Sequence, residues 1–198
     1  MFSRLTVIAA LALVAGGLAA WILRTGQESL PPTEVTGKAI VGGPFSLVDQ
    51  TGRRVTDKDF RGKKMLVYFG FTSCPDVCPA GLQVIAAALD RLGPKAEAIT
   101  PIFITVDPER DTPAKMAEYV KSFHPRLVGL TGTADEVNAV AKAYRVYFKK
   151  IPDEKTPDAY SVDHTSIMYL MDENGGFVRH FSYPIEASQL VAELAKYL

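Results

Sequence analysis

The feature that most constrains the fold is an alternation, from Pro44 onward, of apolar runs with stretches whose apolar residues recur at helical spacing. The runs Lys64 to Phe71 (KMLVYFGF) and Ile99 to Val106 (ITPIFITV) are almost entirely apolar, as expected of strands buried on both faces. Amphipathic helices are predicted to begin at Pro79, where proline suits the first turn, and at Pro113. This alternation predicts an α/β domain with a mostly parallel central sheet and helices on both faces.

Shorter apolar segments flank this central pattern. Gly52 and the pair Asn174-Gly175 each separate two such segments, and glycine at such a turn predicts a β-hairpin. A short strand, a helix, a polar loop and a closing helix complete the expected order. Their expected positions are Leu127 to Leu130 for the strand, Ala134 to Val146 for the helix, Lys149 to Tyr160 for the loop, and a start at Ile185 for the closing helix.

The N-terminal segment from Leu5 to Leu23 carries no charge and lies between Arg4 and Arg24. As a helix it would be about 28 Å long, close to the roughly 30 Å hydrocarbon core of a bilayer. A cleaved signal peptide is the alternative, because Gly17-Leu18-Ala19 could serve as a cleavage site. An uncleaved transmembrane helix is the preferred prediction, since the run is long for a signal peptide and Trp21 suits the membrane interface.

Three parts of the chain are therefore predicted: a membrane anchor at residues 1–26, a linker at residues 27–43 and a globular domain at residues 44–198. The linker contains prolines and glycines and has no helical or strand period. The short positive N-terminus leaves no room for an organellar transit peptide and favours an exported globular domain. We expect a single-pass protein of a bacterial inner membrane, with its globular domain in the periplasm.

The charge balance argues against one broad class of partner. The 198 residues include 22 basic and 22 acidic side chains, so the formal net charge is zero. No run of like charge is long enough to form a basic patch, and nucleic acid is not expected as a partner.

The chain contains two cysteines, Cys74 and Cys78, in the segment GFTSCPDVCPAG between the first buried strand and the following helix. A structural disulfide would close so short a loop that it would stabilise the fold by only about 1.5 to 2 kcal/mol. Structural zinc generally needs four ligands, and the chain has no further cysteine. Copper(I) accepts fewer ligands and prefers sulfur, and a helix N-terminus favours thiolates. These residues alone fit both metal binding and thiol exchange.

A nitrogen ligand could come from one of three histidines. His124 stands at the end of a predicted helix, where it would interact with the helix dipole, and His180 alternates with apolar neighbours in a predicted strand. His164 lies in a polar segment just before a predicted core strand. This position makes His164 the candidate ligand.

Two acidic residues, Asp107 and Asp111, follow the second buried strand. In sheets of this kind, working residues lie in loops beyond the carboxyl ends of the strands, so we expect this loop beside the cysteines. Asp111 also precedes Thr112-Pro113, a pattern typical of a helix start. A role for Asp111 as a capping or turn residue is therefore the alternative.

The domain contains the segments GFTSCPDVCP, FITVDPERDTP, LVGLTGTADEV, AYRVYF and VDHTSIMYL, in this order. In order and spacing they resemble the Sco/SenC family of membrane-anchored copper proteins, which are needed to assemble the CuA centre of cytochrome c oxidase. The resemblance runs from about Pro44 to Tyr183. It implies a thioredoxin-like sandwich fold, which is consistent with the predicted order of strands and helices.

The resemblance also implies a site and a role. Cys74 and Cys78 match the family's C-x-x-x-C-P copper ligands, and His164 matches the histidine of its D-H motif, the third ligand. Asp107 and Asp111 match its D-x-x-x-D pattern, whose first acidic residue is placed near the metal or the partner surface. The implied function is a copper chaperone that holds one Cu(I) or Cu(II) ion per domain. It would deliver this copper to the copper-bearing subunit of cytochrome c oxidase, with other copper chaperones as further partners.

Two other functions fit the same residues. The cysteines could form a redox disulfide in a thiol-disulfide reductase that keeps the client's copper-ligand cysteines reduced, or the protein could be a copper or redox sensor. Ordinary thioredoxins have C-x-x-C and a facing cis-proline, whereas this chain has an extra residue between its cysteines and no proline between Pro157 and Pro184. General disulfide oxidoreductase activity is therefore not implied by the fold, and we do not expect an enzyme.

Overall fold

The computed structural model describes residues 41–152 and 160–198, and the architecture is that of these residues. The predicted anchor at residues 1–26, and the predicted linker as far as residue 40, lie outside this part of the chain. Among the described residues, no helix combines the length and the apolar character needed to cross a membrane.

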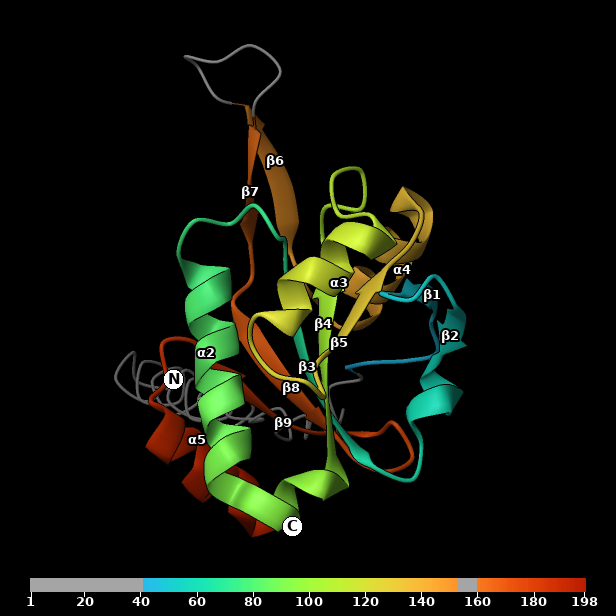
Figure 1. Cartoon of the computed structure of the whole chain (residues 1–198). Helices are drawn as coiled ribbons and strands as arrows, with labels where there is room; N and C mark the ends of the chain where they lie inside the picture. Colours follow the sequence, from blue (N-terminus) through green and yellow to red (C-terminus); the bar gives the residue numbers. More distant parts are fainter. Residues whose placement is uncertain (1–40, 153–159) are drawn as a thin grey trace, which may run out of the picture. The chain divides into compact units, whose positions relative to one another are not determined.

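The main sheet is mixed rather than mostly parallel. Its seven strands lie in the order β2-β1-β5-β4-β3-β8-β9 (Figure 1). Only the pairs β3–β4 and β4–β5 are parallel, so the prediction of a mostly parallel sheet is wrong outside these central strands. The two edge hairpins, β1–β2 and β8–β9, are antiparallel. The strands that join these hairpins to the central strands, β1 beside β5 and β8 beside β3, also pair antiparallel. The strands are β1 (Ser46–Asp49), β2 (Arg54–Thr56), β3 (Lys64–Gly70), β4 (Ile99–Thr105), β5 (Val128–Thr131), β8 (Ile167–Met171) and β9 (Phe177–Ser182).

Strand β3 is buried along almost its whole length. It pairs with β4 on one side and with β8 on the other. Leu66 and Tyr68 belong to one hydrophobic core cluster, the Tyr68 cluster, and Val67 and Phe69 belong to a second, the Phe69 cluster. Successive side chains of a strand point to opposite faces, so β3 separates the two cores. This double burial explains why its sequence shows no polar alternation.

Helices cover both faces of the sheet, as predicted. Three of them contribute buried side chains to the Tyr68 cluster, and a fourth contributes to the Phe69 cluster, which Cys78 of α2 also joins. The Tyr68 side carries α2 (Val77–Leu92), α3 (Pro113–Lys121) and α5 (Ala187–Leu194), and the Phe69 side carries α4 (Ala134–Ala143). Three short 3-10 helices are η1 (Asp57–Phe60), η2 (Gly93–Ala98) and η3 (Ala195–Tyr197).

Strands β6 (Phe148–Pro152) and β7 (Tyr160–His164) form a separate two-stranded antiparallel sheet, the β6–β7 ribbon. The ribbon extends beyond the end of the main sheet, beside the loop that precedes α2 (Figure 1). The prediction of a polar loop from Lys149 to Tyr160 is therefore wrong at both of its ends. Most residues of β6 are exposed, so the segment lacks the alternation of apolar and polar residues that marks a half-buried strand.

Gly70, the last residue of β3, has no space for a side chain. A Cβ at this position would lie 2.7 Å from Cys78 Sγ and 2.8 Å from the Phe103 ring. We predict that Gly70→Ala lowers the free energy of unfolding, measured by urea denaturation, by about 1–3 kcal/mol, because an overpacked core forces its neighbours to shift. Gly43→Ala is the control, since its Cβ would meet Ala143 Cβ at 3.7 Å, an ordinary contact. Equal stability of Gly70→Ala and the wild type would contradict this prediction.

Candidate metal centre

The segment that carries the two cysteines joins β3 to α2. Cys74 lies in the loop, where its N–H donates to Phe71 O at 3.2 Å. Helix α2 begins at Val77, two residues before the predicted Pro79, so Cys78 lies in its first turn. The Cys78 N–H donates to Cys74 Sγ at 3.4 Å, while the helix has no capping hydrogen bond from its N-cap side chain. The Cys74 sulfur therefore accepts one of the N–H groups that a helix N-terminus leaves unpaired.

His164 reaches the cysteines from the last position of β7. Its Nε2 lies 3.1 Å from Cys78 Sγ, and its Nδ1 lies 3.1 Å from Thr165 O. Because a carbonyl oxygen can only accept, we assign the proton to Nδ1, which leaves the Nε2 lone pair facing the sulfur. Histidines that bind metals commonly have this arrangement, in which the other ring N–H donates to a carbonyl group.

The two sulfurs and one ring nitrogen form a cluster suited to a metal ion. The ligand atoms of Cys74, Cys78 and His164 all lie within 4.8 Å of one another. Within residues 41–152 and 160–198, this is the one group of three or more His, Cys, Asp or Glu residues close enough to hold a metal. Both cysteines are free thiols. The donor set falls short of the four ligands usual for structural zinc, but it suits Cu(I) or trigonal Cu(II).

The two thiols differ in burial and in proton affinity. Cys78 is 0% exposed, whereas Cys74 is half-buried. A hydrogen bond from the Cys78 thiol, supported by backbone N–H groups, holds the pKa of Cys74 well below its ordinary range. The same hydrogen bond, together with burial, raises the pKa of Cys78. The more accessible sulfur of the pair is therefore the one that more readily loses its proton.

Asp111 fixes the start of the cysteine loop. Its fully buried carboxylate accepts hydrogen bonds from the Thr72 N–H at 2.9 Å, from the Thr72 hydroxyl at 2.6 Å and from the Thr105 hydroxyl at 2.6 Å. The cap of α3 is Thr112, whose hydroxyl accepts a backbone N–H of the first turn. The alternative that Asp111 caps this helix is therefore wrong. Asp111 instead connects β4 to the residue two positions before Cys74.

Asp107 connects the loop between β4 and α3 to the β6–β7 ribbon. Its carboxylate is 0% exposed, pairs with Arg110 and accepts a 2.8 Å hydrogen bond from the Tyr160 hydroxyl. Tyr160 is the first residue of β7, the strand that ends at His164. Among the described residues, neither Asp107 nor Asp111 belongs to the metal-binding cluster, and both connect the elements that carry it.

Sequence reasoning did not single out Arg110 and Tyr160. Arg110 lies between the two noted aspartates, and its role appears only when the β6–β7 ribbon is in place. A usable signal was the spacing of Tyr160, Val162 and His164, since alternate residues of a strand share one face. The sequence instead predicts a loop as far as Tyr160 and a polar segment around His164, and neither prediction uses this spacing.

The other two histidines lie outside the cluster, as expected. The Nδ1 atom of His124 accepts the N–H of Arg126 at 3.1 Å, just beyond the end of α3. His180 is exposed on β9 and its ring stacks on Phe177, with centroids 6.4 Å apart. Each of these side chains thus has a local contact away from the cysteines.

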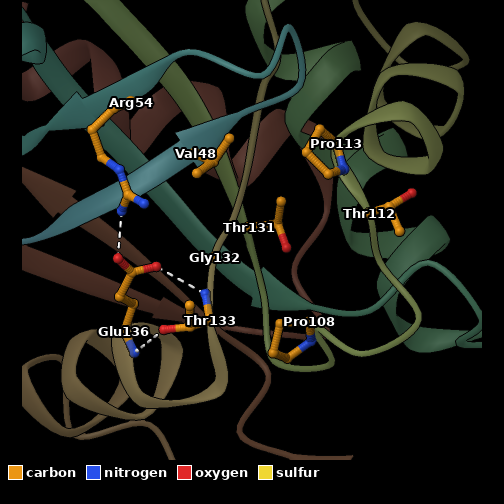
Figure 2. Close-up of a pocket in the computed structure, with 9 residues that line it drawn as sticks. All are labelled: Val48, Arg54, Pro108, Thr112, Pro113, Thr131, Gly132, Thr133 and Glu136. Carbon is orange, nitrogen blue, oxygen red and sulfur yellow. Dashed lines mark hydrogen bonds and ion pairs between the residues drawn. The ribbon is translucent and has the colours of Figure 1, made fainter.

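A pocket of about 220 Å³ lies beside the loop between β4 and α3, and Figure 2 shows the residues that line it. The two charged side chains in its wall, Arg54 and Glu136, form an ion pair with each other, and Glu136 also accepts the Thr133 N–H at the start of α4. The cysteines and His164 are absent from its lining, so this pocket is not the candidate metal centre. It is lined by Val48, Arg54, Pro108, Thr112, Pro113, Thr131, Gly132, Thr133 and Glu136.

Fold and cluster together define a class of protein: a thioredoxin-like α/β domain in which a C-x-x-x-C segment faces a histidine from a later strand. The family model described as SCO1/SenC matches residues 33–198. The chain therefore belongs to the SCO1/SenC family, as the resemblance of its motifs predicted.

Curated relatives match most of this chain. The human protein "Protein SCO1 homolog, mitochondrial" is 48% identical over 164 residues, which are 82% of this chain and 54% of the human protein. The SCO2-like protein of Rickettsia prowazekii is 40% identical over 154 residues, covering 78% of this chain and 75% of that protein. The chain spans about half the length of the first of these relatives.

Solved structures of relatives share the fold. The structure of Bradyrhizobium japonicum ScoI with copper bound is 47% identical, has a TM-score of 0.74, and the match covers 80% of this chain and 99% of that one. The crystal structure of Arabidopsis thaliana ScoI with copper bound is 45% identical, has a TM-score of 0.75, and the match covers 79% and 96%. Both of those proteins therefore hold copper on the fold that this chain adopts.

The unequal pKa values predict unequal alkylation of the two cysteines. The lowered pKa of Cys74 keeps it a thiolate well below neutral pH, so its rate with iodoacetamide should stay nearly constant between about pH 5 and 8. An ordinary thiol loses about tenfold in rate for each pH unit below its pKa of about 8.5. Peptide mapping by mass spectrometry should find Cys78 unmodified while Cys74 reacts. A Cys74 rate that follows the ordinary thiol profile would contradict the assignment.

Proposed function

We propose that this protein is a copper chaperone. Cys74, Cys78 and His164 hold one copper ion per domain as cargo, and the domain delivers it to the CuA site of cytochrome c oxidase during assembly. The observation that carries this proposal is the convergence of two sulfurs and one imidazole nitrogen within 4.8 Å. The copper-bound structures of relatives with 45% and 47% identity support copper as the cargo.

The donor chemistry supports a site that both holds and releases copper. Thiolates bind Cu(I) strongly, and the added nitrogen also allows Cu(II) to bind. Three protein ligands leave a coordination position to which a sulfur of the client can bind. Delivery then proceeds by exchange of thiolate ligands, without a redox step.

We further propose that the domain works in the periplasm, tethered to a bacterial inner membrane by the helix expected at residues 1–26. The uncharged run from Leu5 to Leu23 supports this placement. A tethered domain reaches proteins of its own membrane, which favours the copper-bearing oxidase subunit as the client. Other copper chaperones are proposed as the donors of the metal.

A thiol-disulfide reductase is the second candidate. It is favoured by the free thiols and by the low pKa of the half-buried Cys74, which make this sulfur a ready nucleophile. Attack by Cys74 on a client disulfide would form a mixed disulfide, and Cys78 would then displace the client thiol and close the Cys74–Cys78 bond. The client gains two electrons and the domain loses them, so each turnover consumes one reduced domain.

Removal of both thiols should abolish copper binding. In the exported domain with Cys74→Ser and Cys78→Ser, we predict that bound copper falls from about one equivalent to near zero, because hydroxyls are poor ligands for a soft metal. Metal analysis of the purified protein and its absorption spectrum measure this loss. Unchanged copper content and absorption in the double variant would overturn the proposed site.

Delivery and reduction can be separated in a strain that lacks the protein. A chaperone defect should be relieved by added copper, measured as recovered cytochrome c oxidase activity, whereas a reductase defect should be relieved by a membrane-permeant thiol. Turnover of a disulfide substrate by the metal-free domain would favour the reductase function. Failure of the metal-free domain to react with that substrate would dismiss it.

Loss of the imidazole should affect the two oxidation states differently. We predict that His164→Ala weakens Cu(II) binding more than Cu(I) binding, because the two remaining sulfurs form a soft site that still suits Cu(I). Competition with chelators of known affinity, run separately for each oxidation state, measures the two losses. Equal losses of affinity would contradict the proposed role of His164.

A further inference from the structure

The three proposed ligands come from two elements with different attachments to the domain. Cys74 and Cys78 lie where β3 enters α2, and both elements are built into the main core. His164 ends β7, whose only strand partner among the described residues is β6. A two-stranded ribbon is marginally stable alone, so contacts outside the ribbon must fix the orientation of β7.

The apolar contacts of the ribbon hold it against the domain without fixing its angle. Val162 is buried in the Phe69 cluster, and Phe148 and Tyr160 pack against this cluster. Such contacts are not directional. The ion pair between Lys150 and Glu109, at 2.6 Å, is largely exposed on both sides, and exposed ion pairs contribute little. The orientation of β7 therefore depends on directional contacts elsewhere.

Arg110, in the loop between β4 and α3, provides those directional contacts. Its Nη1 donates to Tyr160 O at 2.9 Å, and its guanidinium carbon lies 3.8 Å from the centre of the Tyr160 ring. The Tyr160 hydroxyl and the Nε of Arg110 both donate to the buried carboxylate of Asp107. A planar guanidinium that stacks on a ring and hydrogen-bonds its backbone fixes both the position and the rotation of that residue.

Arg110 also faces the cysteine side of the site. Its guanidinium carbon lies 5.7 Å from the centre of the Phe71 ring, and that ring meets the His164 imidazole edge-on at 5.8 Å. Phe71 directly follows β3 and accepts the N–H of Cys74 through its carbonyl oxygen. One side chain thus contacts the residue that starts the histidine strand and the residue that starts the cysteine loop.

This arrangement is not the one that stability alone would favour. The Nη2 atom of Arg110 is buried and has no hydrogen-bond partner among the described residues. A buried donor without a partner costs about 1–3 kcal/mol. An unpaired buried donor in a native structure calls for an explanation, and a role of the guanidinium in positioning the site provides one.

We propose that Arg110 is a positioning residue: through Tyr160 it holds β7 so that His164 meets the two cysteines, and it thereby sets how well the site holds Cu(II) relative to Cu(I). The inference rests on the proposed copper-binding function. With the ribbon held, copper meets two sulfurs and a nitrogen. With the ribbon released, it meets two sulfurs, a set that suits Cu(I) and binds Cu(II) poorly.

The test compares Arg110→Gln with His164→Ala and with the double variant. We expect Arg110→Gln to lower the affinity for Cu(II) about tenfold, which is the usual effect of removing a group that orients a metal ligand. The affinity for Cu(I) should change less. Its Cu(II) spectrum should shift toward that of His164→Ala. The double variant should bind Cu(II) no more weakly than His164→Ala alone. If Arg110 acts only by orienting His164, its removal has no further effect when the imidazole is already absent.

A measurement without metal separates this inference from the proposed function. In the copper-free domain, Arg110→Gln should speed amide hydrogen exchange in β6 and β7 by on the order of tenfold, while β3 and β4 keep their protection. Arg126→Gln is the matched control, because Arg126 Nη1 also donates to a backbone carbonyl, Ala96 O, at 2.9 Å. This control should leave the ribbon unchanged.

Arg110→Lys provides a second variant in case Arg110→Gln fails to fold. It keeps the positive charge and loses the planar stack, so it should resemble Arg110→Gln in both measurements. Unchanged exchange in the ribbon, or additive losses of Cu(II) affinity in the double variant, would overturn the positioning role. A wild-type domain that binds no copper would overturn the proposed function and the metal preference together, while the exchange result would still decide whether Arg110 holds the ribbon.

Discussion

The burial of β3 on both faces is the constraint on which the site depends. Residues 65–70 are buried, β4 pairs with the whole strand and β8 pairs with residues 65–68, so packing and hydrogen bonds hold β3 in place. The next residues must therefore leave the sheet at a fixed point, and Asp111 holds Thr72 there from the neighbouring strand's loop. The position of both sulfurs follows from the packing of the core together with the hydrogen bonds that Asp111 accepts from Thr72.

The histidine is placed by a different kind of interaction. Its ribbon adds no strand to the main sheet, and a few oriented contacts between the loop after β4 and the start of β7 fix its angle. The site thus combines a rigid half, set by the packing of apolar side chains, with a half that depends on a buried carboxylate, a guanidinium and a phenol. This division is the basis of the proposal that Arg110 decides whether the nitrogen ligand meets the sulfur ligands.

The parts of the fold that could be predicted from sequence are strands buried along nearly their whole length and turns that need a glycine. The runs at β3 and β4 are buried on both faces, and Gly52 and Gly175 mark turns with positive φ angles, so each pattern is local and strong. The ribbon was missed because most of β6 is exposed. The cysteines and His164 were found from their chemistry and from the family resemblance, and the structure brings these three together. The contacts of Asp111 and Arg110 depend on tertiary neighbours far along the chain, which no local pattern contains.

The two sulfurs differ in exposure, and this difference would give the proposed copper transfer a direction. Cys78 lies beneath the chain at Gly70, where even a methyl group would meet its sulfur at 2.7 Å, whereas Cys74 faces the solvent side. In the proposed delivery, a client thiolate would meet the half-buried Cys74 before the buried Cys78, so the bond to Cys74 would be exchanged first and the bond to Cys78 last. In the proposed transfer, the buried sulfur would hold the ion until a client sulfur has bound it.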